Sequence, residues 1–316
     1  MFDEKFITNA INRSAETKLD RRKLLAAAGI GAAGIGAAVL APAAGAVAAP
    51  AVSAAGISDG SILNFALNLE YLEAEFYLHA VTGAGLPASL VGGKQAVGSV
   101  TGGKQVKFAT PAIKAYAEEI AADERAHVAF LRAALGSAAV SRPAINISDA
   151  FTSAAVAAGV IKQGQTFDPY ADEVSFLIGA FIFEDVGVTA YKGAAALVTN
   201  KTYLEAAAGI LSVEAYHAGI VRSSLYRIGV ETPSVIDTVN KISAARDSLD
   251  GSTSLDQGIT VNGKANLVPT DANGITFSRT PGQVLNIAYL NPKAVTKGGF
   301  FPSGVNGALN TSGGAA

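Results

Sequence analysis

The sequence predicts an all-α fold: a four-helix bundle with a long crossover between its second and third helices, followed by a loop-rich C-terminal extension with short helices. Two observations support this prediction. Long Ala-rich segments with helical character alternate with Gly- and Pro-rich breaks. Along these segments, a glutamate followed by a Glu-x-x-His phrase occurs twice. A bundle core that holds two metal ions draws its ligands from four helices in this pattern.

The first two helices of the bundle are bounded by capping signals. The first is expected to begin at Ser58 or Asp59, which suit the N-cap, and to end near Val81, ahead of a glycine. A Gly-rich loop follows over residues 83–108. It contains Gly-Gly-Lys-Gln twice but lacks the spacing of a phosphate-binding loop. The second helix is expected over 110–135, opening at a Thr-Pro pair.

The second helix pair follows a long connection, which we expect over residues 137–168. The third helix is predicted from about Pro169 to Val198. Asn200 suits the N-cap of a fourth helix that ends near Gly229. A long link in this place is expected of bundles that are not simply up-down-up-down. We therefore assign residues 58–230 to the bundle.

The remainder, 231–316, is expected to form a C-terminal extension that packs on or near the bundle. A fifth helix is predicted over 233–249, and a short helix over 281–289, each opening at a Thr-Pro pair. Between them, two Asn-Gly turn signals predict loops or a small hairpin. From Lys297 the Gly/Ser/Asn-rich chain is expected to fray, except where two phenylalanines, Phe300 and Phe301, could pack against the bundle.

Six side chains are candidate metal ligands. In each Glu-x-x-His phrase the carboxylate and the imidazole lie on one helix face. The other two glutamates come from the first and third helices. Four carboxylates would offset the charge of two divalent ions, and this donor set suits Fe or Mn, with Zn not excluded. The predicted ligands are Glu70, Glu124, His127, Glu184, Glu214 and His217.

Two tyrosines are candidates for a supporting role at this site. Tyr77 and Tyr191 each follow a candidate glutamate by seven residues, which is about two helical turns, so each shares a face with that glutamate. They suit hydrogen-bond donors to ligand carboxylates or redox-active phenols; packing in the core is the alternative. Glu73, one turn after Glu70, could be a further ligand or a hydrogen-bond acceptor beside the site.

Three other titratable residues are expected to lie away from the metals. His79 lies on the opposite face from Glu70, which predicts a surface or interface histidine. Asp123 and Asp185 each adjoin a candidate ligand but point about 100° away from it. Both are therefore expected to be charges on helix surfaces.

Composition narrows the class of protein. Hydrophobic residues make up 50% of the 316 residues and charged residues 16%, so a large buried core is available. The net charge of −2 and the lack of a basic block predict no nucleic-acid partner. The chain has no cysteine, which excludes disulfides, zinc sites with thiolate ligands and cysteine-bound iron–sulfur clusters.

Residues 1–48 are expected to be a twin-arginine-type signal peptide. Arg21 and Arg22 precede a mildly apolar Ala/Gly run, and Ala46-Val-Ala48 offers a cleavage site. An uncleaved membrane anchor or an N-terminal helix is the alternative, but glycine disfavours a permanent helical span. We therefore expect export to the periplasm or beyond, with no permanent membrane span after cleavage.

The quoted residues resemble the ferritin-like superfamily over about 58–230. The segment Asn68–Ala80 is similar to the first helix of bacterioferritin or rubrerythrin, where a ligand Glu precedes a Tyr by seven. The Glu-x-x-His phrases match the ligand pairs of the second and fourth helices, and Glu184 matches the ligand of the third. Asn266–Pro281 and Gly298–Pro302 more specifically resemble exported ferritin-like proteins related to plant desiccation-related proteins.

The resemblance implies a di-metal protein, and it leaves three interpretations open. The first is an exported protein with two Fe or two Mn ions and redox chemistry on peroxide or dioxygen, of the ferroxidase or catalase type. The second is a structural protein of desiccation or stress protection, with a metal-stabilised or vestigial site. The third is iron storage. A homo-oligomer is compatible with the sequence. The closed cage of ferritins is not expected, because a cage needs free and matched outer faces.

Overall fold

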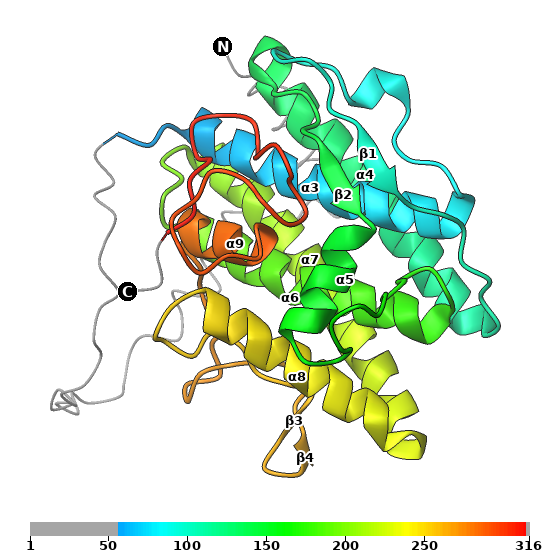
Figure 1. Ribbon diagram of the computed structural model, residues 1–316. Helices are drawn as coiled ribbons and strands as arrows, with labels where there is room; N and C mark the ends of the chain where they lie inside the picture. Colours follow the sequence, from blue (N-terminus) through cyan, green and yellow to red (C-terminus); the bar gives the residue numbers. More distant parts are fainter. Residues whose placement is uncertain (1–55, 314–316) are drawn as a thin grey trace, which may run out of the picture.

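The computed structural model describes residues 56–313 and is all-α, with a four-helix bundle at its centre (Figure 1). The leader predicted for 1–48 lies outside the described residues. Two helix pairs form the bundle, α3 with α4 and α6 with α7. Their bounds are Asp59–Thr82 for α3, Pro111–Leu135 for α4, Glu173–Ala195 for α6 and Lys201–Glu231 for α7.

Side-chain caps fix where these helices begin. The Ser58 side chain accepts a hydrogen bond from the Ser61 amide at the start of α3. Asn200 caps α7 in the same way, as its sequence position predicts. The third helix begins later than expected from Pro169, because Asp172 takes the N-cap position of α6 and accepts from the Ser175 amide.

The connections contain more secondary structure than the sequence predicts. The first loop holds η1 (Ala88–Leu90) and β1 (Val100–Gly102), and the crossover holds η2 (Gly136–Ala138), β2 (Ile145–Ile147) and α5 (Asp149–Ala157). β1 and β2 pair in parallel and so join the two connections. Ile145 and Ile147 are buried on either side of Asn146, which is a strand alternation too short to stand out in the sequence.

The C-terminal extension packs against the α6–α7 side of the bundle (Figure 1). It consists of α8 (Pro233–Leu249), a hairpin of β3 (Thr260–Val261) and β4 (Lys264–Ala265), and α9 (Pro281–Ala288). Phe300 and Phe301 are buried, as predicted. The fraying expected from Lys297 is wrong up to residue 313, because Val305 and Ser312 are also buried and hydrogen bonds hold this segment to the rest of the extension.

A buried ion network attaches the extension to α6. Asp185 Oδ2 lies 2.7 Å from Arg222 Nη1 and 2.7 Å from Arg246 Nη2. Arg246 and Arg279 both pair with Asp256, and all five side chains are buried. The prediction that Asp185 is a surface charge is therefore wrong. The reason is tertiary: α8 and the loop that contains Asp256 cover the face of α6 that carries Asp185.

α6 is the most apolar helix of the bundle. It is long and apolar enough to cross a membrane by length and composition, yet 83% of its most apolar window is buried inside the protein. A core helix of a large bundle shows the same composition, since its whole surface is covered. Here α6 is covered by α3, α7, α8 and α9.

Candidate metal centre

The six predicted ligand side chains converge in the interior of the bundle. Each of the four bundle helices contributes at least one of them, and all six are buried. α3 contributes Glu70 and α6 contributes Glu184. α4 and α7 contribute their Glu-x-x-His pairs, Glu124 with His127 and Glu214 with His217.

The six side chains form two adjacent groups that share one carboxylate. Within each group the potential ligand atoms all lie within 4.8 Å of one another. Glu124 belongs to both groups. The first group also contains Glu70, His127 and Glu214, and the second contains Glu184 and His217.

Both imidazoles turn the same ring nitrogen towards the carboxylates. His127 Nδ1 lies 3.1 Å from Glu70 Oε2 and 3.6 Å from Glu124 Oε2. His217 Nδ1 lies 3.1 Å from Glu124 Oε1 and 3.7 Å from Glu184 Oε2. Each group therefore offers one imidazole nitrogen and several carboxylate oxygens to a common point, and Glu124 turns one oxygen to each group.

The donor atoms at this centre fit a cation. Both carboxylate oxygens of Glu124 and of Glu214, one of Glu184, and Nδ1 of His217 find no hydrogen-bond partner within residues 56–313. Buried polar atoms without partners are costly, and buried carboxylates more so. A pair of cations would satisfy these atoms at once. Carboxylates with imidazoles suit Fe or Mn, and affinity alone does not exclude Zn.

Without a cation, the centre compensates its negative charge with protons. Burial raises the pKa of Glu70 to about 7 and that of Glu184 to about 8. Burial and the neighbouring carboxylates also raise the pKa values of Glu73 and Glu214. Burial alone would do the same at Glu124, but its two imidazole neighbours outweigh burial and lower its pKa to about 2.

The pKa values of the two histidines are raised, as expected for imidazoles among carboxylates. Burial lowers the pKa of an imidazole, but the carboxylates of Glu70 and Glu124 outweigh it and raise the pKa of His127 to about 11. Glu184 and Glu124 likewise raise that of His217 to about 9. The centre therefore attracts positive charge, whether this arrives as protons or as metal ions.

The two tyrosines link α3 and α6 through the candidate ligands. Tyr77 on α3 donates a hydrogen bond to Glu184 Oε1 on α6, and Tyr191 on α6 donates to Glu70 Oε1 on α3. From helical spacing, each tyrosine was expected beside the glutamate of its own helix. In the structure, each tyrosine instead donates its hydrogen bond to the glutamate of the other helix. The phenols therefore hold one oxygen of each carboxylate and fix its orientation.

Replacing Tyr77 by phenylalanine should weaken metal binding without abolishing it. Loss of a hydrogen bond that orients a ligand typically costs about 10- to 100-fold in metal affinity. We expect the Tyr77→Phe and Tyr191→Phe variants each to show a Kd raised within this range, with the metal content at saturation unchanged. Competition titration with a chelator measures both quantities. An unchanged Kd in both variants would show that the phenols serve packing alone.

Asp123 contacts His217 from outside the group of six candidate ligands. Its Oδ2 lies 3.1 Å from His217 Nε2, and its side chain is 43% exposed. It is thus the surface charge that was predicted, but it also contacts the ring nitrogen that faces away from the cluster. Such a contact fixes the ring and makes the other nitrogen a better ligand. The sequence gives no signal for it, because the contact joins α4 to α7.

Two further residues were considered from the sequence. Glu73 is buried near the cluster, where the charges of Glu124 and Glu70 raise its pKa in addition to burial. His79 lies outside both ligand groups, as predicted; of the two positions expected for it, at the surface or at an interface, the first is wrong and the second stays a prediction. Its side chain is only 14% exposed, because the loop at Gly103 covers it, and its Nδ1 lies 2.7 Å from the Glu75 carbonyl oxygen.

Comparisons with known proteins agree with this architecture. A family model described as a ferritin-like domain matches residues 58–227. Two similar proteins each align with 79% of this chain. A ferritin-like catalase, Nec2 of Nesocodon mauritianus, is 27% identical and aligns over 84% of its own length. The desiccation-related protein PCC13-62 of Craterostigma plantagineum is 29% identical and aligns over 83%. No solved structure matches significantly.

Because the family model covers more than half of the 316 residues, the chain belongs to the ferritin-like domain family.

Proposed function

We propose that this chain is an exported di-metal carboxylate protein that acts on hydrogen peroxide through two Fe or two Mn ions. One observation carries the proposal: two adjacent ligand groups share Glu124, and within residues 56–313 both carboxylate oxygens of Glu124 and of Glu214 and one of Glu184 have no hydrogen-bond partner. The relative named a ferritin-like catalase supports peroxide as the substrate. Dioxygen is the alternative oxidant.

The residues have distinct roles in this proposal. Glu70, His127 and Glu214 would hold one ion, Glu184 and His217 the other, and Glu124 both. When bound, the ions supply the electrons that reduce peroxide and take them back when peroxide is oxidised. Tyr77 keeps Glu184 in place, and Tyr191 keeps Glu70 in place, through their hydrogen bonds. The burial of all six ligands keeps bulk water away from the centre.

A direct test loads the protein with Mn or with Fe and measures metal content, peroxide consumption and dioxygen release together. Disproportionation converts two hydrogen peroxide molecules into two waters and one dioxygen, so the release of one dioxygen for every two peroxides consumed identifies this reaction. Peroxide consumed without dioxygen indicates a peroxidase that needs a reductant. A protein that holds about two ions per chain, as the shared-ligand pattern requires, yet consumes no peroxide would contradict the proposal.

A structural role in desiccation protection is the second candidate. The relative named a desiccation-related protein favours it, and so does a centre whose ligands are all buried. In this case the metals would stabilise the bundle without turnover. Metal binding and a large stabilisation, with no consumption of peroxide by either metal form, would favour this candidate over the first.

We further propose that export follows the twin-arginine route. The proposal rests on Arg21 and Arg22, the apolar run after them and the Ala46-Val-Ala48 cleavage signal. Replacing both arginines by lysine preserves the charge, so it should leave uncleaved precursor in the cytoplasm only if the route reads the arginine pair itself. Cell fractionation and the mass of the exported chain test this. Unchanged export of the double variant would indicate another route.

A further inference from the structure

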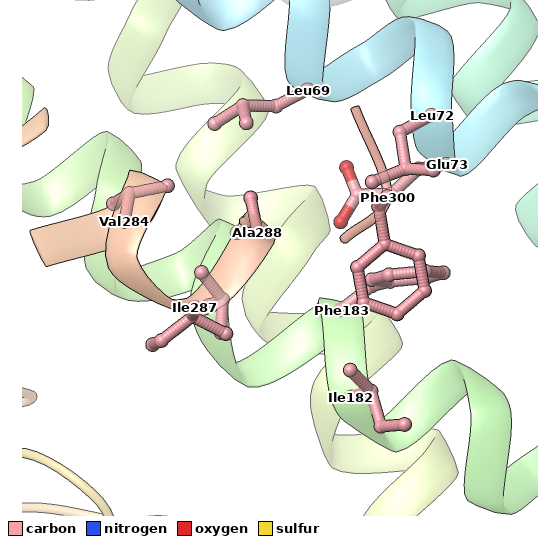
Figure 2. Close-up of a pocket in the computed structure, with 11 residues that line it drawn as sticks. Leu69, Leu72, Glu73, Ile182, Phe183, Val284, Ile287, Ala288 and Phe300 are labelled. Carbon is pink, nitrogen blue, oxygen red and sulfur yellow. The ribbon is translucent and has the colours of Figure 1, made fainter. Parts of the chain in front are cut away.

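A small, largely apolar cavity lies between α3 and α6 of the bundle and the C-terminal extension (Figure 2). Its volume is about 30 Å³. The walls come from α3, α6, α9 and Phe300, and all eleven lining residues are buried. Glu73 is the one charged residue among them. The lining residues are Leu69, Leu72, Glu73, Ile182, Phe183, Val186, Gly187, Val284, Ile287, Ala288 and Phe300.

Two of the lining residues connect this cavity to the metal centre. A methyl group at Gly187 would overlap Glu214 Oε2 and would lie 3.4 Å from Glu73 Oε1. The Gly187 position therefore lies both on the cavity wall and directly beside a candidate ligand. Figure 2 shows the Glu73 carboxylate between the side chains of Leu69 and Ala288 on one side and Phe300 on the other. The cavity and the candidate metal ligands are thus adjacent at Gly187, where the lack of a side chain leaves space for Glu214.

The wall of this cavity is supplied in part by residues outside the family match. Val284, Ile287 and Ala288 of α9 and the Phe300 ring all lie beyond residue 227. Phe300 is held firmly: its ring centroid lies 4.9 Å from that of Phe183, and its amide donates to the Ala288 carbonyl oxygen at 2.9 Å. The extension therefore closes one side of the space next to the centre.

We propose that this cavity is the binding pocket for a small neutral oxidant, and that Phe300 and α9 set the upper limit on its size. The inference rests on the proposed function and names the substrate class for it. A volume of about 30 Å³ admits one or two molecules of the size of water. Hydrogen peroxide and dioxygen meet this limit, whereas organic hydroperoxides with bulky alkyl groups do not. Apolar walls favour uncharged ligands, since burying an anion there without a partner for its charge would be costly.

A matched pair of variants tests the size limit. Phe300→Ala removes a cavity wall. Phe301→Ala removes the same ring from the next residue, which is equally buried but contacts Tyr289 and does not line the cavity. With the metal-loaded full chain, we expect Phe300→Ala to raise the ratio of kcat/KM for tert-butyl hydroperoxide to that for hydrogen peroxide by about tenfold or more. Phe301→Ala should keep the wild-type ratio.

Milder variants guard against unfolding. If either alanine variant fails to fold, Phe300→Leu and Phe301→Leu repeat the comparison with smaller losses of volume. A ratio that is unchanged in the folded Phe300 variant, or raised equally in both members of a pair, would overturn the size limit. Metal content measured on each variant shows that the change does not come from lost ions.

A binding measurement that needs no turnover tests the pocket itself. Dioxygen is paramagnetic, so under pressure it should speed the relaxation of the methyl groups of Leu72 and Ile287 in the metal-free full chain. Val239 and Ile242, which are buried elsewhere, are the reference methyls. Ala288→Leu should fill the cavity and remove the enhancement. If the lining and reference methyl groups of the wild type relax at the same enhanced rate, the cavity is not a binding pocket for dioxygen.

The activity measurement and the relaxation measurement together separate the pocket assignment from the proposed function. If the loaded protein consumes no peroxide, the proposed function fails, while the relaxation measurement still reports on the pocket. If it consumes hydrogen peroxide at the same rate with the cavity filled by Ala288→Leu, the proposed function stands and the pocket assignment is wrong. Enhanced relaxation together with a loss of peroxide consumption in Ala288→Leu supports both.

Discussion

Replacing Glu124 by alanine should remove both metal ions, although only one of six ligands is lost. Glu124 is the single residue that belongs to both ligand groups, and its two oxygens face the two different histidines. Loss of a terminal ligand such as Glu70 should weaken mainly the ion in its own group. We therefore expect metal content to fall from about two ions per chain to the background level in Glu124→Ala. The double variant with Glu214→Ala should give the same result. Elemental analysis of the purified protein measures this.

The control for this prediction lies on the same helix. Glu119→Ala removes a carboxylate that is exposed on α4, so it changes net charge and helix composition in the same way without touching the cluster. It should retain full metal content. Circular dichroism of both variants shows that each is folded. Stoichiometric metal in a folded Glu124→Ala variant, or in the double variant, would mean that the six residues are not the ligands.

Helical periodicity was sufficient to bring the cluster together. The spacing inside each Glu-x-x-His phrase fixes a shared face, and a buried polar face is visible in the sequence because its neighbours are apolar. The caps at Ser58 and Asn200 were likewise local signals. The two caps are confirmed, and the six side chains lie together, because each pattern depends on residues within one or two turns of each other.

Features that depend on contacts between distant segments could not be predicted in this way. Asp185 occupies a helix position that would be on the surface of an isolated bundle; α8 and the loop that follows it cover this position, and Arg222 and Arg246 pair with the buried carboxylate. The contact between Asp123 and His217 also joins two helices. Tyr77 is a further example: helical spacing placed it on the helix face of the candidate ligands, but it did not predict that its hydrogen-bond partner is Glu184 on another helix.

The metal-free protein should lose stability as the pH rises, and bound metal should remove that loss. In the folded metal-free chain Glu70 and Glu184 keep their protons up to about pH 7 and 8, whereas the same groups release them near 4.5 when unfolded. Between these pH values the folded state binds more protons than the unfolded state, so its stability falls as the pH rises.

The histidines act in the same direction at higher pH. Their folded pKa values of about 11 and 9 exceed the unfolded value of 6.5, so their contribution is complete below pH 6.5 and is lost as the pH rises towards 9 and above. Glu124 acts in the opposite direction, because its pKa is lowered to about 2. Its contribution is lost only as the pH falls below 4.5, outside the range of interest. The net expectation is a fall in stability from pH 5 to pH 9.

The size of the effect follows from the shift at one residue. A pKa shift of one unit corresponds to about 1.4 kcal/mol, so Glu70 alone contributes roughly 3 kcal/mol between its two pKa values. For a domain of this size, roughly 1 kcal/mol moves the Tm by about 2–4 °C. Glu70 alone should therefore lower the Tm of the metal-free chain by roughly 5–10 °C between pH 5 and pH 8, and Glu184 and the two histidines should add to this fall.

Bound metal should reverse this dependence, because it takes the place of the protons. Its ligands are ionised carboxylates and neutral imidazoles, so affinity rises with pH. A ligand that binds only the folded state at a thousandfold excess over its Kd stabilises it by about 4 kcal/mol. The gap in Tm between loaded and metal-free protein should thus be small at pH 5 and roughly 10 °C or more at pH 8. Melting curves at both pH values, with and without metal, measure the gap, and Glu124→Ala should abolish it. Identical curves for the loaded and metal-free wild type at pH 8 would rule out a stabilising metal pair, because a cluster of buried carboxylates that gains its counter-charge from metal must be more stable with it than without it.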